Sequence, residues 1–175
     1  MKGAWLALGL VLVLCGPGCE RTAPASPPGV AEPADGEERA NAVAPEFTLP
    51  DLAGGDVSLS ALRGRPVVID FWATWCAPCE RQVPVLNAFH DKYGDRIPVL
   101  GIAVDVDGAT SVTPFVEQHE LRYRVLLGDE GLAQDYDAFG FPTLYVIRPD
   151  GTIHSAHVGV VSPEALEAAV AEWAG

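Results

Sequence analysis

Two cysteines separated by two residues are the strongest chemical feature of this sequence. Cys76 and Cys79 lie in the stretch IDFWATWCAPCE, residues 69–80, with two tryptophans and an aspartate that stands inside an apolar run. A Cys-x-x-Cys pair can be half of a structural zinc site, a short structural disulfide or a redox pair. Each of these alternatives requires different accompanying residues elsewhere in the chain.

A zinc site needs four ligands, and the chain has no second Cys-x-x-Cys pair. The other candidate ligands, His154 and His157, fall in an expected strand. Because alternate strand positions face opposite sides, we expect these two side chains to point apart, and we predict no metal site. A purely structural disulfide is also disfavoured, because closing so short a loop constrains the unfolded chain very little.

The redox alternative explains the location of the pair, between the buried strand expected at 66–73 and a helix that begins at Ala77. Free N–H groups at a helix start favour negative charge, so they stabilise a thiolate on Cys76, and the thiolate is the nucleophile. We expect Cys76 to lie at the exposed end and to attack. Cys79, one turn into the helix, is expected to be buried and to act as the resolving thiol.

Asp70 is the one charged residue in the apolar strand before the cysteines. Burial of a lone carboxylate raises its pKa, and such a group can take the proton from Cys79 when that thiol attacks a mixed disulfide. The alternative is a buried acid satisfied by a neighbour. Farther along, DVDG at 105–108 resembles the start of a calcium loop but lacks the later ligands, so we predict a strand-end loop there.

Strands and helices alternate through the rest of the chain, which predicts an α/β sheet. The predicted first hairpin joins Phe47–Leu49 to Val57–Leu59, and the last one joins its strands through the turn RPDG. That last hairpin makes the sheet mixed. Helices are predicted at 77–93, with Pro84 inside and Gly94 at the end, and at 112–120, 130–139 and 162–174; the remaining strands are predicted at 97–104, 123–128, 143–147 and 152–158.

The segment VVIDFWATWCAPC resembles the active site of the thioredoxin superfamily, and GFPT, with Pro142, resembles its cis-proline loop. The opening hairpin and the extra helix and strand before Pro142 resemble the TlpA/ResA-like branch of exported thiol–disulfide oxidoreductases. The resemblance runs from Pro45 to the C-terminus, so we assign 45–175 to one thioredoxin-like domain. It implies a thioredoxin fold, an α/β fold with a central mixed sheet flanked by helices, an N-terminal hairpin and a helix–strand insertion.

The resemblance also implies an activity, in which Cys76 and Cys79 reduce disulfides of exported proteins and no cofactor takes part. It implies protein substrates, re-reduction by a membrane electron donor, a monomeric state and a role of the cytochrome c maturation type. The residues that it places at the substrate are Trp75, Ala77, Pro78, Phe141 and Pro142.

Two positions depart from the ResA-like pattern. Gln82 stands where many members carry glutamate, and because glutamine cannot titrate, proton handling is left to Asp70. This departure puts a specific apocytochrome role in doubt. Asp70 itself follows thioredoxin, whereas the ResA-like branch often has asparagine.

The residues disfavour three other functions. A peroxiredoxin needs threonine three residues before its reactive cysteine, where this chain has Ala73. A copper-handling module of the Sco type needs a longer Cys-x-x-x-Cys spacing. A non-catalytic binding module would not need the intact cysteine pair.

The N-terminus predicts export. One lysine, a short apolar run and small residues make 1–19 a signal peptide or lipoprotein leader, with an uncleaved anchor as the alternative. Cys19 is the candidate lipid anchor, although Gly16 stands where such sites usually carry leucine. Residues 20–44 are rich in Pro, Ala and Glu and predict a disordered tether. We therefore expect a periplasmic or cell-envelope protein held at the membrane by its tether alone, and the net charge of -13 argues against nucleic-acid binding.

Overall fold

A continuous apolar run of β-branched and aromatic residues forms the central strand of the protein. The computed structural model describes residues 40–175. In it, β3 (Val67–Trp72) is buried along its whole length, pairs parallel with β4 (Val99–Ala103) and pairs antiparallel with β6 (Thr143–Ile147). The edge strands are β5 (Arg124–Leu127) and β7 (Ile153–Val158), in the order β5-β4-β3-β6-β7. The predicted mixed sheet is confirmed.

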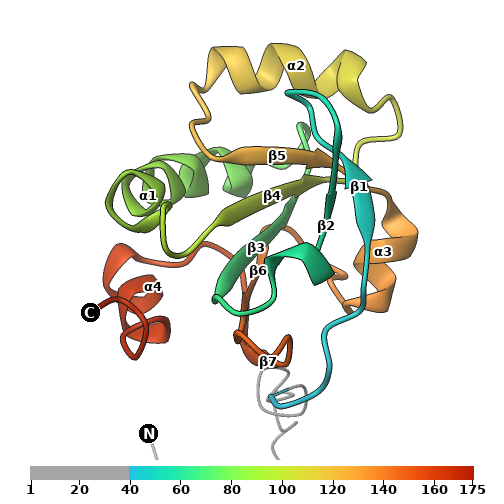
Figure 1. Cartoon of the computed structure of the whole chain (residues 1–175). Coiled ribbons are helices and arrows are strands. Elements are labelled where there is room, and N and C mark those ends of the chain that lie inside the picture. Colours follow the sequence, from blue (N-terminus) through green and yellow to red (C-terminus); the bar gives the residue numbers. More distant parts are fainter. Residues whose placement is uncertain (1–39) are drawn as a thin grey trace, which may run out of the picture. The chain divides into compact units, whose positions relative to one another are not determined.

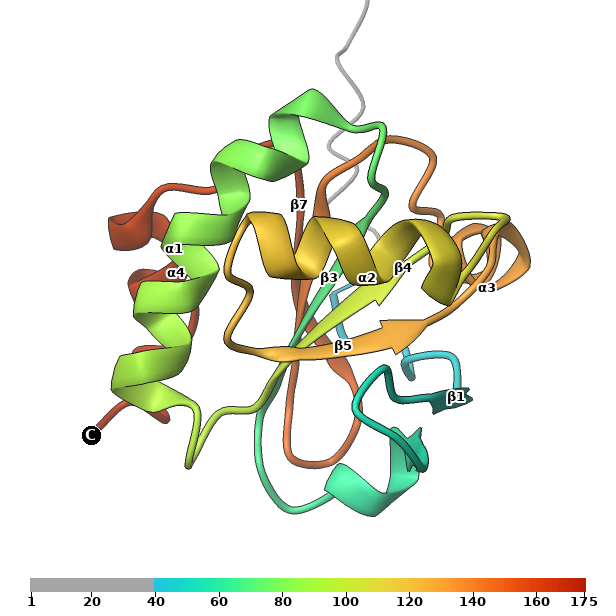
Figure 2. The same cartoon turned by 90° about the horizontal axis from the view of Figure 1, so that it is seen from above.

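Helices cover both faces of this sheet (Figure 1). Apolar side chains of α1 (Ala77–Tyr93) and α4 (Pro163–Ala169) pack together on one face with those of Val68 and Leu144. On the other side Figure 1 shows α3 (Glu130–Asp135), next to the small antiparallel sheet of β1 (Thr48–Pro50) and β2 (Asp56–Ser58). Figure 2 shows α2 (Ala109–Gln118) running beside β5. A 3-10 turn, η1 (Ser60–Leu62), leads into β3. The thioredoxin fold is therefore observed.

Helix ends differ from the predicted ones where apolar periodicity carried no signal. The bounds of α1 are as predicted, because Cys76 caps its start and Gly94 its end. In contrast, α3 stops at Asp135 rather than 139, since Asp137 adopts a left-handed φ of 53° that a helix cannot continue through. The last helix is also shorter than predicted and ends at Ala169.

Residues 41–46, here called the N-terminal strap, run along the turn between β6 and β7. The Asn41 N–H donates to the Ile153 carbonyl at 2.8 Å, and the Ala44 N–H donates to the Gly151 carbonyl at 3.0 Å. Residues 41–44 were predicted to belong to the disordered tether. In the structure these residues pair with the sheet, and Ala44 is buried. This pairing depends on backbone hydrogen bonds, which the amino-acid composition does not reveal.

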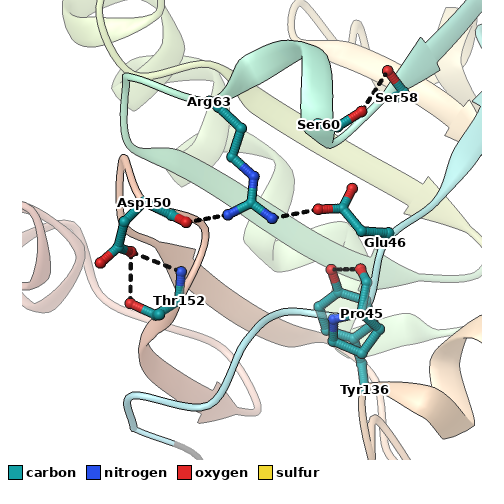
Figure 3. Close-up of polar contacts among 8 residues, drawn as sticks. All are labelled: Pro45, Glu46, Ser58, Ser60, Arg63, Tyr136, Asp150 and Thr152. Atoms are coloured by element: carbon teal, nitrogen blue, oxygen red, sulfur yellow. Dashed lines mark hydrogen bonds and ion pairs between the residues drawn. The ribbon is translucent and has the colours of Figure 1, made fainter.

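Side chains hold the end of the strap (Figure 3). Arg63 reaches both the Glu46 carboxylate and the Asp150 carbonyl, and the Tyr136 hydroxyl donates to the Pro45 carbonyl at 2.7 Å. The strap is therefore attached near the first residue of β3, at the end of the sheet opposite to the cysteines.

Among residues 40–175, no helix has both the length and the apolar character that crossing a membrane requires. The predicted leader at 1–19, the candidate lipid anchor Cys19 and the tether up to residue 39 lie outside the described residues.

Candidate active site

The cysteine pair lies at the corner where β3 ends and α1 begins. Cys76 and Cys79 form a disulfide, with their Cα atoms 5.3 Å apart. Cys76 is the N-cap of α1, and its Sγ accepts a hydrogen bond from the Cys79 N–H at 3.2 Å. Because this N–H and the helix dipole both favour negative charge, the position suits a thiolate on Cys76.

Both cysteines are buried in this oxidised state. Cys76 is 5% exposed and Cys79 is 2% exposed. The expectation of an exposed Cys76 is therefore wrong for the disulfide form, in which both cysteines belong to the hydrophobic core cluster. The predicted order, with Cys79 the deeper of the two, holds by a small margin.

Asp70 is buried in the middle of β3, between Gly101 of β4 and Leu144 of β6. Burial raises the pKa of its carboxyl well above the ordinary value, and Oδ1 has no hydrogen-bond partner among the described residues. Since alternate strand residues share a face, Asp70 points to the same side as Val68, the face that Leu86 and Phe89 of α1 cover. The alternative of an acid satisfied by a neighbour finds no support at this oxygen.

Two aromatic residues crowd the sheet beside Asp70. A Cβ on Gly101 would lie 2.8 Å from Cε2 of Tyr123 and 3.0 Å from Nε1 of Trp72, so only glycine fits there. The negative charge of Asp70 adds to burial in raising the pKa of Tyr123. Trp72 is wholly buried and packs on Phe115, with ring centroids 4.8 Å apart. The carboxyl therefore lies in an apolar environment with little water.

The peptide bond between Phe141 and Pro142 is cis, as the resemblance predicted. Phe141 meets Trp75 edge to face, with ring centroids 5.8 Å apart. The structure thus brings together two of the predicted substrate-binding side chains, one next to Cys76 and one next to the cis-proline. Ala77 is exposed and Pro78 half-buried in the first turn of α1.

Exposed apolar side chains gather around this corner. Trp75 is 68% exposed, Phe139 78% and Val158 68%, and Val160 follows β7. Val158 pairs with Thr143, the residue after the cis-proline, and its Cγ1 lies 3.8 Å from where a Cβ on Gly140 would stand. We call Trp75, Phe139, Phe141, Val158 and Val160 the active-site rim.

Sequence reasoning missed the residue that holds the chain before Cys76. Buried Asp105 accepts hydrogen bonds from the Thr74 N–H at 3.2 and 3.1 Å and from the Thr74 hydroxyl. The DVDG segment follows a strand, as predicted, but its first aspartate fixes the backbone two residues before the nucleophile. An aspartate directly after a buried strand was the available signal.

Gln82 is buried on α1 at 1% exposure. Its Oε1 accepts a hydrogen bond from the Val161 N–H at 2.7 Å, and its Nε2 has no partner among the described residues. From the sequence, Gln82 was expected only to be unable to titrate, and no structural role was predicted for it. In the structure it joins the cysteine helix to the loop after β7.

His154 and His157 do not point apart, contrary to the prediction from strand alternation. A β-bulge shifts the register of β7, so that Ser155 pairs with Val146 while Ile153 pairs with Ile147. His154 consequently lies against Trp173 near α4, on the same side as His157, whose pKa is lowered by burial and by the charge of His154. Within residues 40–175, no three His, Cys, Asp or Glu side chains gather closely enough to hold a metal.

Comparison with known proteins connects this geometry to a family. The AhpC/TSA family model matches residues 40–156. The ResA thiol–disulfide oxidoreductase of Bacillus cereus is 35% identical over 127 residues, which cover 71% of this chain and 72% of that protein.

Solved structures show the same likeness. A protein of Chlorobium tepidum assigned as the thiol:disulfide interchange protein DsbE has a TM-score of 0.70 and 31% identity, covering 76% of this chain and 96% of that one. A secreted disulfide oxidoreductase of Mycobacterium tuberculosis has a TM-score of 0.63 and 26% identity, covering 78% and 98%. With its Cys-x-x-Cys disulfide, the chain belongs to the AhpC/TSA family and, within its thioredoxin fold, is a thiol–disulfide oxidoreductase of the ResA and DsbE type.

Proposed function

We propose that this enzyme reduces disulfides of exported proteins and that Cys76 is its attacking thiol. The observation that carries the proposal is the N–H of Cys79 aimed at Cys76 Sγ, at the start of a helix and beside the cis-proline loop. The Cys76 thiolate attacks one sulfur of a substrate disulfide. The substrate S–S bond breaks, a mixed disulfide forms and the first substrate thiolate leaves.

Cys79 then completes the exchange. It loses its proton to Asp70 and attacks Cys76 Sγ, which breaks the mixed disulfide and releases the second substrate thiolate. The substrate gains two electrons and the enzyme ends with the Cys76–Cys79 disulfide that the structure holds. The raised pKa of Asp70 supports this role, because burial makes the carboxylate a stronger base toward the proton of a thiol.

The active-site rim supports a polypeptide substrate. Its side chains offer apolar and aromatic surface, most of it exposed, from the loop before α1, the loop before β6, the end of β7 and the loop after β7. A surface of this kind suits an extended, partly unfolded segment better than a small polar disulfide. Trp75, Phe141 and Pro142 are the residues proposed to contact it, with Ala77 and Pro78 at the helix start.

Export and attachment belong to the same proposal. The leader at 1–19, lipidation at Cys19 and a tether up to the strap would hold the domain at a membrane, where a membrane donor re-reduces it. The secreted relative from Mycobacterium tuberculosis supports the extracytoplasmic location. Gln82 argues against a specialised role in cytochrome c maturation, since a titrating glutamate is absent.

Trapping of mixed disulfides tests the proposal. Cys79→Ser should accumulate covalent adducts with disulfide-containing proteins, because the resolving thiol is gone, whereas Cys76→Ser should trap none. Capture is read on non-reducing gels and by mass spectrometry. If only the Cys76→Ser variant formed adducts, Cys79 rather than Cys76 would be the nucleophile. In a separate assay, copper binding by the reduced protein without reduction of insulin would favour a copper-handling module.

A further inference from the structure

The loop after β7 is held between the two halves of the active site. On one side, the Gly159 N–H donates to the carbonyl of the cis-proline, Pro142, at 2.8 Å. On the other side, the Val161 N–H donates to Oε1 of Gln82 on α1 at 2.7 Å. Residues 159–161 therefore bridge the substrate loop and the cysteine helix.

Gln82 is well placed to control this bridge. It lies three residues after Cys79, so both side chains leave the same face of α1. It is almost fully buried, and its partner Val161 is 6% exposed, so water cannot readily replace the bond. Two members of the active-site rim, Val158 and Val160, flank Gly159 in the chain.

We propose that Gln82 is a positioning residue, which sets the distance between the Cys76–Cys79 helix and the rim side chains Val158 and Val160. The inference rests on the proposed function, because it assigns these valines to the surface that receives a polypeptide. Removing the acceptor would leave a buried N–H without a partner, and the loop would shift to solvate it. The cysteines would keep their chemistry while the substrate surface lost its shape.

A neutral amide suits this position better than an acid. A carboxylate at the same buried place would carry a charge out of water, without a cationic partner among the contacts of Gln82 in the described residues. The amide holds the Val161 N–H at every pH. The structure thus gives Gln82 a role that does not depend on titration.

The test compares Gln82→Met, which keeps the size but removes the acceptor, with Asn87→Leu as the matched control. Asn87 is also a buried amide on α1, and its Oδ1 accepts the Arg122 N–H at 2.8 Å, on a loop without rim residues. The full-length reduced proteins react with a disulfide-bonded peptide and with hydroxyethyl disulfide, well below their melting temperatures.

Gln82→Met should raise KM for the peptide by about tenfold, with kcat and the rate with hydroxyethyl disulfide unchanged. Its Val161 amide should also exchange hydrogen faster. Asn87→Leu should lower the melting temperature and alter neither rate. Gln82→Glu keeps an acceptor oxygen, so it should preserve the slow Val161 exchange and the peptide KM at about pH 5, where the buried acid is neutral.

Equal losses with both disulfides, or an unchanged peptide KM, would overturn the inference, as would unchanged Val161 exchange. A different result bears on the proposed function. If the wild type reduces neither disulfide, that proposal fails, and Val161 exchange alone decides whether Gln82 holds the loop.

Discussion

At the residue scale, two buried aspartates near the cysteines have opposite surroundings. Asp70 has an oxygen without a partner and a carboxyl whose pKa burial raises. The carboxylate of Asp105 accepts hydrogen bonds from the N–H and the hydroxyl of Thr74. Asp70 is therefore suited to exchange a proton, and Asp105 is suited to fix the backbone before Cys76. Their different roles follow from hydrogen bonding rather than from residue type.

Asp70→Asn should slow resolution of the mixed disulfide by on the order of a hundredfold, because no group then accepts the Cys79 proton. The first attack by Cys76 should change much less. Stopped-flow measurement of the two steps separates them. Equal rates of resolution in variant and wild type would remove Asp70 from the mechanism.

The same substitution should stabilise the protein at neutral pH. Folding raises the pKa of Asp70, so the folded state binds this proton more tightly than the unfolded state does. The stability contribution is full below the ordinary aspartate pKa of 3.8 and is lost as the pH rises through the folded pKa. Asp70→Asn should raise the melting temperature by roughly 5 °C at about pH 7 and by almost nothing below about pH 4. A gain that is independent of pH would contradict this cause.

Asp105→Ala should release the chain before Cys76, because Thr74 loses its hydrogen-bond partner. We expect a loss of about 2 kcal/mol in the free energy of unfolding and a slower attack by Cys76. Denaturant titration and thiol-alkylation rates measure the two effects. Asp107→Ala is the control, since Asp107 is exposed and makes only a long contact with Ser111. Equal behaviour of the two variants would show that Asp105 does not position the nucleophile.

At the scale of elements, the parts of the protein divide between the two ends of the sheet. The strand-to-helix corner, the cis-proline loop and the loop after β7 meet at one end. The strap, η1 and the turn between β6 and β7 meet at the other, around Arg63 (Figure 3). Because β3 and β6 run between these ends, changes at the strap should leave the active site intact.

Arg63→Met should loosen the strap without slowing the enzyme. The ion pair with Glu46 is partly exposed, so the loss of stability should stay near ~0.5–1 kcal/mol. Amide exchange at Asn41 and Ala44 should accelerate, while the rate with a soluble disulfide stays unchanged. Lys92→Met, which breaks the exposed pair with Glu167 at 2.8 Å, should leave strap exchange alone. A slower Arg63→Met enzyme would contradict the separation of the two ends.

At the scale of the whole molecule, the chain enters the domain at the end of the sheet away from Cys76. The strap pairs with residues 151–153, beside the start of β3. The strand β3 then runs for about 17 Å, and the two cysteines follow its last residue, Trp72. The strap therefore joins the domain at the end of the sheet that lies away from Cys76.

The anchored enzyme should accordingly react with a soluble disulfide as fast as its unanchored form. Full-length protein in membrane vesicles and a Cys19→Ser variant should show second-order rates within about a factor of two, since the strap joins the domain away from Cys76. A tenfold slower anchored enzyme would show that attachment restricts access to the rim. Retention of the Cys19→Ser variant in the membrane would contradict the lipid anchor itself.

Local signals in the sequence were enough for the strand-to-helix corner and most of the fold. The bounds of α1 follow from its cap and helical periodicity, and the central strands follow from β-branched runs. The cysteine pair and the cis-proline were found through short motifs that keep their meaning without long-range contacts. Turn residues marked the last hairpin. These features depend on neighbours within a few positions of the chain.

Only the tertiary structure decided which polar groups act together. Asp105 and Thr74 are 31 residues apart, and Gln82 and Val161 are 79 apart. Periodicity shows which face a side chain takes but not which partner meets it there. The bulge in β7 and the pairing of the strap likewise depend on backbone hydrogen bonds, which composition does not encode. The sequence by itself therefore determined the chemistry at the cysteines, and the packing of distant segments determined how that chemistry is held in place.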